Sequence, residues 1–443
     1  MATMTEQHQP AHSPAQSQST SNYKWPEHVA AKMADFIHEE VKDMLGNSRL
    51  VRSSDGISLV HRNELTVGRL LGKGAFSEVH EVKYKNHVFA MKHLKLRLMS
   101  QPENFRLAAS ELAVEAHMLA SFSHPNILRI RGWAFNGISS FADGRHDSFF
   151  LLLDSLDETL DHRIATWTKE AASSAMDEHR MPGSTGSGPQ THKGLVSGIW
   201  RRLSLHQTPQ VGGGPANEMS EVERLQEQKR RNLFLDKLGI GTEIAAALMY
   251  LHEMGVIFRD LKPNNIGFLH GRVQLFDFGL SRELPQLDVQ MPFEMSGKVG
   301  TLRYMAVEVA QHRPYNVAAD VYSWSMVCYE LMTLQKPFGG WTRDMHNNLV
   351  CGKGVRPEFT TDISYPLKHL LEQSWAQKPR DRPNMRQVVD RLRVMEEEQL
   401  LLCQTQATAA SPGRGGVQPE QAQNQQPQGF GRFMGRGRRS SGR

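Results

Sequence analysis

Apolar residues along this chain follow two different patterns. Between about residues 63 and 95 they form short runs around a glycine-rich turn, as in EVHEV and HVFAMKHL, which is typical of β-strands. Across about residues 225–254, 317–332 and 365–401 they recur at helical spacing. The sequence therefore predicts a strand-rich part followed by a mostly helical part, which is an α+β organisation.

Helical spacing also predicts two helices outside these regions. One covers about residues 25–44 and ends near Gly46, and we interpret it as a helix that packs beside the next domain. The other covers about residues 106–122 and carries Glu115 among the apolar residues near one face.

Three segments lack the apolar periodicity that a packed core requires. Residues 1–22 are rich in Gln, Ser, His and Pro, the stretch between about 167 and 222 collects Ser, Gly, Pro and Gln, and residues 404–443 are rich in Gln, Gly, Pro and Arg. Such compositions bury too little apolar surface to offset the entropy of ordering the chain. We expect all three to be disordered, with the middle one inserted within a single domain.

Charge, cysteine usage and the N-terminus narrow the class of protein. Lys and Arg number 52 against 47 Asp and Glu, and much of this +5 excess lies in the tail, so it does not indicate a nucleic-acid-binding domain. The three cysteines form no C-x-x-C pair, which favours a reducing compartment. No signal peptide or membrane-spanning run is present in the sequence, so we expect a cytoplasmic protein without membrane association, with the nucleus not excluded.

Glycines and one lysine in the strand-rich part are the first candidates for chemistry. In LLGKGAFSEVHEV, Gly72 and Gly74 lie between two predicted strands, where backbone N–H groups can approach a phosphate closely, although such glycines also serve ordinary hairpin turns. Lys92 lies within the apolar strand VFAMK, where a cation is costly unless it meets an anion. A lysine on an edge strand is the alternative for Lys92.

Two later motifs carry the strongest chemical signal. FRDLKPNNIGF contains Asp260, Lys262 and Asn265, and VQLFDFGLSR contains Asp277. Two carboxylates and a carboxamide at this spacing suit a hydroxyl acceptor together with Mg²⁺.

Taken in order, these motifs resemble the eukaryotic protein kinase family, serine/threonine type, with the tyrosine-kinase-like group as the nearest subgroup. The resemblance implies a bilobal fold, with a small lobe of antiparallel β-sheet plus one helix and a mostly α-helical large lobe. Composition and apolar spacing predict a disordered segment (1–22), a helical extension (23–60) and a disordered tail (404–443), and the resemblance implies a kinase domain between them (61–400). Within the domain the small lobe spans about 61–153 and the large lobe about 154–166 and 223–400, separated by the insertion at about 167–222.

The resemblance also assigns the ATP site. Ala90 would lie above the adenine, Lys92 would contact the α- and β-phosphates, and Glu115 would pair with Lys92. The loop covering ATP would comprise Gly72, Lys73, Gly74, Ala75, Phe76, Ser77 and Val79.

The segment FFLLLDSL resembles the hinge between the lobes. Leu153 takes the gatekeeper place, and the stretch from Asp154 to Leu156 would offer backbone groups to adenine. One departure concerns the same pocket, because Gly267 stands where an apolar residue commonly packs under adenine. Less apolar contact there would weaken ATP binding.

In the catalytic loop, the resemblance implies that Asp260 orients the substrate hydroxyl or accepts its proton and that Lys262 steadies the γ-phosphate. Asn265 and Asp277 would hold Mg²⁺.

Three further residues have structural roles by resemblance. Glu308 should form a buried ion pair with Arg382, and Asp320 should hold the catalytic-loop backbone by hydrogen bonds. Phe258 replaces the usual His of the catalytic loop and is expected to stack beside Phe278.

The function predicted from the sequence is transfer of the ATP γ-phosphoryl group to serine or threonine hydroxyls of a protein substrate, by a monomer that uses ATP and Mg²⁺. Lys262, and Thr301 before LRYMA, favour serine/threonine acceptors. A pseudokinase scaffold that acts by binding partners is the alternative. The tail is interpreted as a solvated segment, with RNA binding through GRGG and GFGRFMGRGRR as a third hypothesis.

Overall fold

The computed structural model describes residues 23–52, 56–178, 221–285, 291–295, 300–359 and 363–409. The chain divides into two compact units between Glu397 and Glu398, and all elements discussed below belong to the first unit except the end of the last helix. The disorder predicted for residues 1–22, and RNA binding by the arginine-rich part of the tail, concern residues outside those described.

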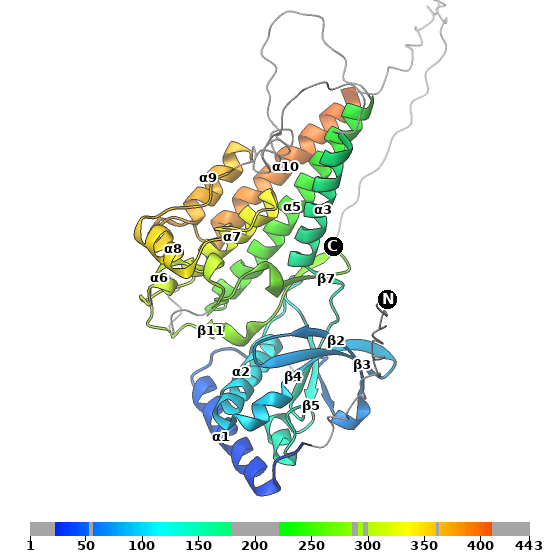
Figure 1. Ribbon diagram of the computed structural model, residues 1–443, viewed down its shortest axis with the longest axis vertical. Coiled ribbons are helices and arrows are strands. Elements are labelled where there is room, and N and C mark those ends of the chain that lie inside the picture. The colour runs from blue at the N-terminus through cyan, green and yellow to red at the C-terminus, as the bar shows by residue number, and fades with distance from the viewer. Residues whose placement is uncertain are drawn as a thin grey trace, which may run out of the picture. The chain divides into compact units, whose positions relative to one another are not determined.

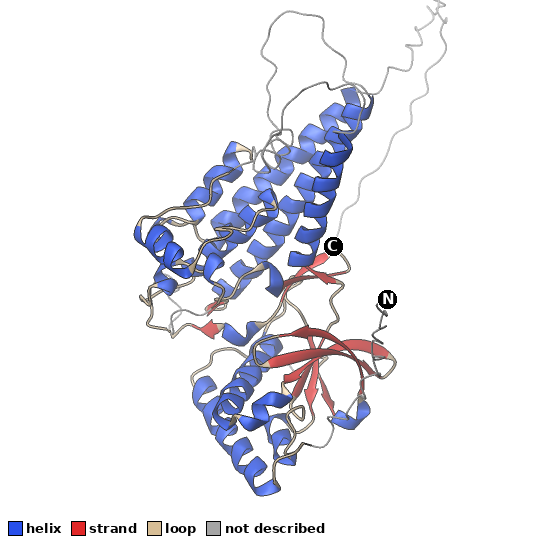
Figure 2. Cartoon of the chain, viewed as in Figure 1, coloured by secondary structure: helices blue, strands red, loops and turns tan. Residues whose placement is uncertain are grey.

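The N-terminal part of the first unit is built on a six-stranded sheet with the order β1-β5-β6-β4-β3-β2 (Figures 1 and 2). A tight hairpin joins β3 to β4, because Lys85 and Asn86 both adopt positive φ angles of 46° and 65°, which suits the twist of antiparallel strands. The strands are β1 (Ser58–Val60), β2 (Thr66–Lys73), β3 (Ser77–Tyr84), β4 (His87–Leu94), β5 (Ile130–Ala134) and β6 (Phe150–Leu153).

One helix, α2, packs against this sheet, and a second helix, α1, packs against α2. The predicted N-terminal helix is confirmed as α1 (Glu27–Leu45), which buries Ala30, Ala34, Ile37 and Val41 on one face. It lies beside α2 (Pro102–Ser121), whose first turn accommodates proline because that position needs no N–H donor. The predicted antiparallel sheet with one helix is confirmed for the small lobe, and the predicted extension adds α1 beside α2 and the strand β1, which pairs in parallel with β5.

The second part of this unit is mostly helical, as the sequence predicts. Its centre is α7 (Ala318–Thr333), in which every residue from Ala319 onward is buried because other elements surround it. Around it lie α3 (Leu160–Glu178), α5 (Glu221–Glu253), α6 (Val307–Ala310), α8 (Arg343–Met345), α9 (Tyr365–Ser374) and α10 (Met385–Ala409). Short strands complete it: β7 (Glu158–Thr159), β8 (Val256–Ile257), β9 (Ile266–Leu269), β10 (Arg272–Leu275) and β11 (Arg282–Glu283).

Two predicted boundaries of disorder are wrong. Helix α3 continues past Trp167, where the insertion was expected to begin, and ends only at Glu178. Its sequence EAASSAMDE is polar but rich in good helix formers, and Lys237 of α5 lies 5.6 Å from the Trp167 ring centroid, so the two helices pack side by side. Helix α10 likewise extends into the predicted tail as far as Ala409.

Among the residues that the structure describes, no helix is long and apolar enough to cross a membrane.

Candidate active site

Lys92 lies at the centre of a three-residue charge cluster. It extends from β4, and its Nζ atom donates to both carboxylate oxygens of Glu115 on α2, at 2.8 and 2.6 Å. The same nitrogen donates to Oδ1 of Asp277 at 2.7 Å. Lys92 and Glu115 are buried, whereas the Asp277 side chain keeps 43% of its surface exposed. The predicted pairing of Glu115 with Lys92 is confirmed, and the edge-strand alternative is wrong because β4 lies inside the sheet.

The charges of this cluster reinforce one another. Burial opposes the positive charge on Lys92, but the carboxylates of Asp277 and Glu115 together raise the pKa of the lysine above its ordinary value. Lys92 in turn lowers the pKa of Asp277. An ammonium and a carboxylate are thus both held charged side by side, as a site for phosphates and a cation requires.

The backbone around Asp277 directs its carboxylate toward Lys92. Asp277 has a φ angle of 66°, in the left-handed region that is uncommon for a residue with a side chain. Phe278 follows and is fully buried, with its ring centroid 5.0 Å from that of Phe258 in an edge-to-face arrangement. The stacking predicted for Phe258 is confirmed, and it anchors the residue after Asp277 in the core.

Asp260 lies in a second polar cluster. Its Oδ2 atom accepts hydrogen bonds from Nζ of Lys262 at 2.5 Å and from Nδ2 of Asn265 at 3.0 Å. Asn265 also donates to the Asp260 carbonyl at 2.9 Å. The other carboxylate oxygen, Oδ1, is buried and has no hydrogen-bond partner among the described residues. Burial raises the pKa of Asp260, and Lys262 opposes the rise.

The two clusters lie close to each other. The backbone N–H of Phe276, next to Asp277, donates to the carbonyl of Asn265 at 3.1 Å. The charge of Asp277 also contributes to the raised pKa of Asp260. The structure therefore brings together Lys92, Asp260, Lys262, Asn265 and Asp277, five residues that the sequence places in three separate motifs.

A buried aspartate fixes the backbone of the catalytic loop. Asp320 of α7 accepts hydrogen bonds from the N–H groups of Phe258 at 2.8 Å and Arg259 at 2.9 Å, and its Oδ2 is 2.9 Å from Nε2 of His252. These bonds hold Arg259 at a φ angle of 75°, immediately before Asp260. The role predicted for Asp320 is confirmed.

The predicted ion pair in the helical part is also confirmed. The two terminal guanidinium nitrogens of Arg382, Nη1 and Nη2, donate to the carboxylate of Glu308 at 2.6 and 2.9 Å, and both side chains are buried. The pair connects α6 to the segment before α10.

The glycine-rich loop connects β2 to β3 and lies next to Lys92 in the sheet. Gly72 pairs with Val79, which in turn pairs with Lys92 of β4. Lys73 ends β2, and Phe76 at the tip is exposed. Ala90 is buried and pairs with Leu153, the predicted gatekeeper, which is buried as well.

Two cations that sequence reasoning missed hold the tip of this loop. Lys95 donates to the carbonyl of Gly74 at 2.5 Å, and Arg97 donates to the carbonyl of Ala75 at 2.7 Å. Within the loop, the N–H of Gly74 donates to the carbonyl of Ser77 at 2.9 Å. Lys95 directly follows β4 and Arg97 lies two residues further along, so their proximity to the loop is a consequence of sheet pairing and not of a sequence motif.

The hinge residues have partners within the protein. The side chain of Asp154 forms a bidentate ion pair with Arg131 at 2.7 and 2.8 Å, and its N–H donates to the carbonyl of Arg129 at 3.3 Å. The N–H of Asp154, one of the backbone groups that the sequence predicts for adenine, therefore already has a partner within the protein. Leu156 lies over Gly267, where its side chain occupies the space that a Cβ atom would fill.

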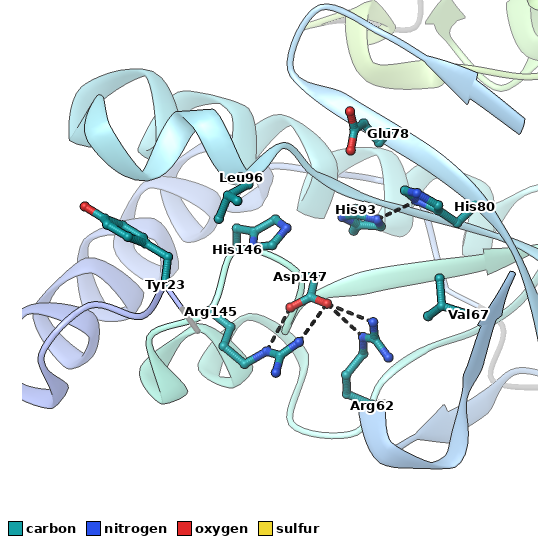
Figure 3. A pocket seen from close by; sticks show the side chains of 10 residues that line it. All are labelled: Tyr23, Arg62, Val67, Glu78, His80, His93, Leu96, Arg145, His146 and Asp147. Carbon is teal, nitrogen blue, oxygen red and sulfur yellow. Dashed lines mark hydrogen bonds and ion pairs between the residues drawn. The ribbon is translucent and has the colours of Figure 1, made fainter. Parts of the chain in front are cut away.

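A polar pocket of about 390 Å³ lies in the small lobe (Figure 3). His80 and His93 are hydrogen bonded at 3.0 Å, and Asp147 accepts from both Arg62 and Arg145. None of the predicted ATP-site residues lines it. Burial lowers the pKa of His93 to about 4, so its imidazole is neutral at pH 7.

Comparison with known proteins gives the same class as the fold and the site. Residues 217–392 match the family described as protein kinase domain. The chain is 34% identical over 162 residues to Serine/threonine-protein kinase STY17 of Arabidopsis thaliana, covering 36% of this chain and 28% of that protein. Serine/threonine/tyrosine-protein kinase HT1 of the same plant is 36% identical over 162 residues, 36% of this chain and 40% of that protein. A probable serine/threonine-protein kinase of Dictyostelium discoideum is 24% identical over 343 residues, 76% of this chain and 20% of that protein.

The fold, the clustered charges and the family match together define a protein kinase domain. Residues 217–392 carry the match to this domain family, and the relatives described above carry the names of serine/threonine or serine/threonine/tyrosine kinases. The family assignment made from the sequence is confirmed. The chain spans less than half of the length of each of these relatives.

Proposed function

We propose that this protein transfers the γ-phosphoryl group of ATP to serine or threonine hydroxyls of protein substrates. The observation that supports the proposal best is the simultaneous assembly of the two charge clusters. Lys92 is paired with Glu115 and Asp277, while Asp260 is held by Lys262 and Asn265. Phosphoryl transfer is catalysed largely by positioning and by electrostatic stabilisation, and both need such prearranged charges.

In this mechanism Asp260 receives the acceptor hydroxyl. Its buried Oδ1 atom accepts the hydrogen bond of the substrate hydroxyl, because Oδ2 is already bound to Lys262 and Asn265. The hydroxyl oxygen forms a bond to the γ-phosphorus, the bond from that phosphorus to the bridging oxygen breaks, and ADP leaves. The hydroxyl proton passes to Asp260, whose raised pKa suits a general base. Asp260 then transfers this proton to water.

The cations stabilise the phosphates of ATP. Lys92 is fully charged and points toward Asp277, where it would bind the α- and β-phosphates. Lys262 lies beside Asp260 and would neutralise charge on the γ-phosphate as it moves to the acceptor.

The oxygen atoms near these cations fit Mg²⁺. The side-chain amide nitrogen of Asn265 donates to Asp260, so its carbonyl oxygen is available to bind a cation. Asp277 accepts from Lys92 through Oδ1, and among the described residues its other carboxylate oxygen is not used in this pair. In the described residues no group of three or more His, Cys, Asp or Glu side chains is arranged to hold a metal. Mg²⁺ prefers one or two protein oxygens together with substrate phosphates, and when bound it supplies neutralisation of phosphate charge.

The test is phosphate transfer from labelled ATP to a degenerate peptide library by the full chain, followed by identification of the modified residue. Wild type should label serine or threonine peptides, whereas Lys92→Met, Asp260→Asn and Asp277→Asn should each lower the rate by at least about a hundredfold. Lys368→Met, which removes a half-exposed lysine from α9, is the matched control and should leave the rate unchanged.

Two outcomes would oppose the proposal. Turnover at the wild-type rate in Asp260→Asn would show that another group receives the hydroxyl. Tight ATP binding by wild type without any labelling would favour the pseudokinase alternative. Labelling of tyrosine peptides would extend the acceptor range to that in the name of the relative Serine/threonine/tyrosine-protein kinase HT1.

A further inference from the structure

The chain between α1 and β1 contacts two elements next to the proposed active site, α2, which carries Glu115, and β11, which follows Asp277. The Oγ atom of Ser48 donates to Oε2 of Glu283 at 2.7 Å and lies 3.2 Å from Nε2 of His117. Ser48 therefore lies between α2, which carries His117, and β11, which carries Glu283. These three residues are far apart in sequence.

Arg49 strengthens the same contact. Its backbone N–H donates to Oε1 of Glu283 at 2.8 Å, and its guanidinium donates to the carbonyls of Leu284 at 2.7 Å and Pro285 at 3.1 Å. The Nε atom lies 3.3 Å from Oε1 of Glu283. A guanidinium with several fixed acceptors is held in one geometry, which a single exposed ion pair would not ensure.

Glu283 is connected to the catalytic loop by backbone pairing. In β11 it pairs with Val256 of β8, and the next residue, Leu284, donates its N–H to the carbonyl of Gly255 at 2.8 Å. Strand β8 leads directly into the loop that carries Asp260. Because β11 also follows closely after Asp277, a displacement of Glu283 would be transmitted to both carboxylates of the site.

Helix α1, which precedes the Ser48–Arg49 segment, is fixed to α2. Glu40 of α1 accepts hydrogen bonds from Arg106 at 2.6 Å and from Ser110 at 2.9 Å, both on α2. Ile37 and Leu50 are buried on either side of the segment. Helix α2 is the element that brings Glu115 to Lys92, so the segment connects that helix to the chain after Asp277.

We propose that Ser48 and Arg49 are positioning residues for phosphoryl transfer, which hold α2 and the chain after Asp277 in the arrangement that assembles the Lys92 cluster. The inference rests on the proposed function. It makes the N-terminal segment part of the catalytic unit, although the resemblance to the kinase family begins only near residue 61.

The experiment compares Arg49→Ala, Ser48→Ala and Arg49→Lys with wild type in the full chain. Arg49→Ala should lower kcat about three- to tenfold, the effect of losing one or two partly exposed charge-assisted hydrogen bonds, with a smaller loss for Arg49→Lys. The thermal midpoint should move by less than about 2 °C. Hydrogen exchange at Arg282–Glu283 and in the half of α2 that contains Glu115 should become faster. Lys32→Ala, at an exposed lysine of α1, is the control and should change none of these quantities.

A double-mutant cycle tests whether the effect passes through Glu283. In a Glu283→Gln background, Arg49→Ala should lower kcat by a smaller factor than in wild type. Unchanged kcat and unchanged local exchange in Arg49→Ala would overturn the inference, as would a loss explained wholly by a lower thermal midpoint. If wild type shows no turnover, the proposed function fails, and the local exchange measurement alone then decides whether Arg49 positions these elements.

Discussion

The side chain of Leu156 fills the space that the absent side chain of Gly267 leaves open. A Cβ atom added to Gly267 would lie 2.5 Å from Cδ1 and 3.1 Å from Cδ2 of Leu156. The sequence predicts a loss of apolar contact under adenine at Gly267. Because Leu156 occupies this space, we expect its side chain to supply the apolar contact to adenine that Gly267 lacks.

We predict that Leu156→Ala raises the KM for ATP about fivefold, because it removes roughly 1 kcal/mol of apolar contact at a site that Gly267 cannot fill. Adding Gly267→Leu to that variant should restore most of the affinity. Val394→Ala, an apolar truncation at an exposed position of α10, is the control. An ATP titration of the initial rate measures the effect, and equal KM values for Leu156→Ala and wild type would refute the role of Leu156.

The ion pair between Arg382 and Glu308 should govern stability more than activity. Arg382→Met leaves a buried carboxylate without its partner and should reduce the free energy of unfolding by about 3 kcal/mol. Urea denaturation followed by tryptophan fluorescence measures this change. Glu372→Gln, which breaks the half-exposed pair with Lys368, should cost less than about 1 kcal/mol. Similar losses for the two variants would contradict the prediction.

The folding stability of the protein should fall at acid pH because of His93 in the small lobe. Its pKa is lowered to about 4 in the folded protein, chiefly by burial, against about 6.5 in an unfolded chain. The unfolded state therefore binds the proton more readily, so the stability that a neutral His93 provides is present above about pH 6.5 and is lost as the pH falls toward 4.

The corresponding test compares unfolding by urea at pH 5 and pH 7.5. Wild type should lose more stability on acidification than His93→Gln, by about 1 to 2 kcal/mol at pH 5. His87→Gln, at an exposed position of the same strand, should behave as wild type does. An identical pH dependence in wild type and His93→Gln would show that this imidazole does not control acid stability.

The chain between α3 and α5 should be dispensable for phosphoryl transfer. Residues 179–220 lie outside those described, but the helices on both sides pack against each other at Trp167 and Lys237. Loop-closure entropy changes slowly with length, so a short Gly/Ser linker in place of 179–220 should keep kcat within about twofold. The thermal midpoint should also be close to that of wild type. Loss of folding or turnover in this variant would show that the segment is part of the domain.

The family, the α+β division and most of the chemistry were predictable from the sequence. The catalytic residues occur in short motifs whose order is fixed, and the partners of Lys92, Arg382 and Asp320 follow once those motifs are recognised. The helices were predictable where apolar residues recur along one face. The end of α3 was not predictable, because the second half of this helix is polar and shows no apolar period. Its helical conformation is favoured by its alanine-rich composition without glycine.

Only the tertiary structure decided the contacts between side chains that do not share a sequence motif. Leu156 reaches Gly267 because two segments are folded against each other, and Ser48 meets Glu283 across a separation of 235 residues. Such contacts depend on shape and on hydrogen-bond geometry after packing, whereas a sequence pattern records only the local period and the order of residues. For this protein the order of motifs determined the class of protein that could be predicted, and the packing determined which neighbouring residues hold the candidate site in place.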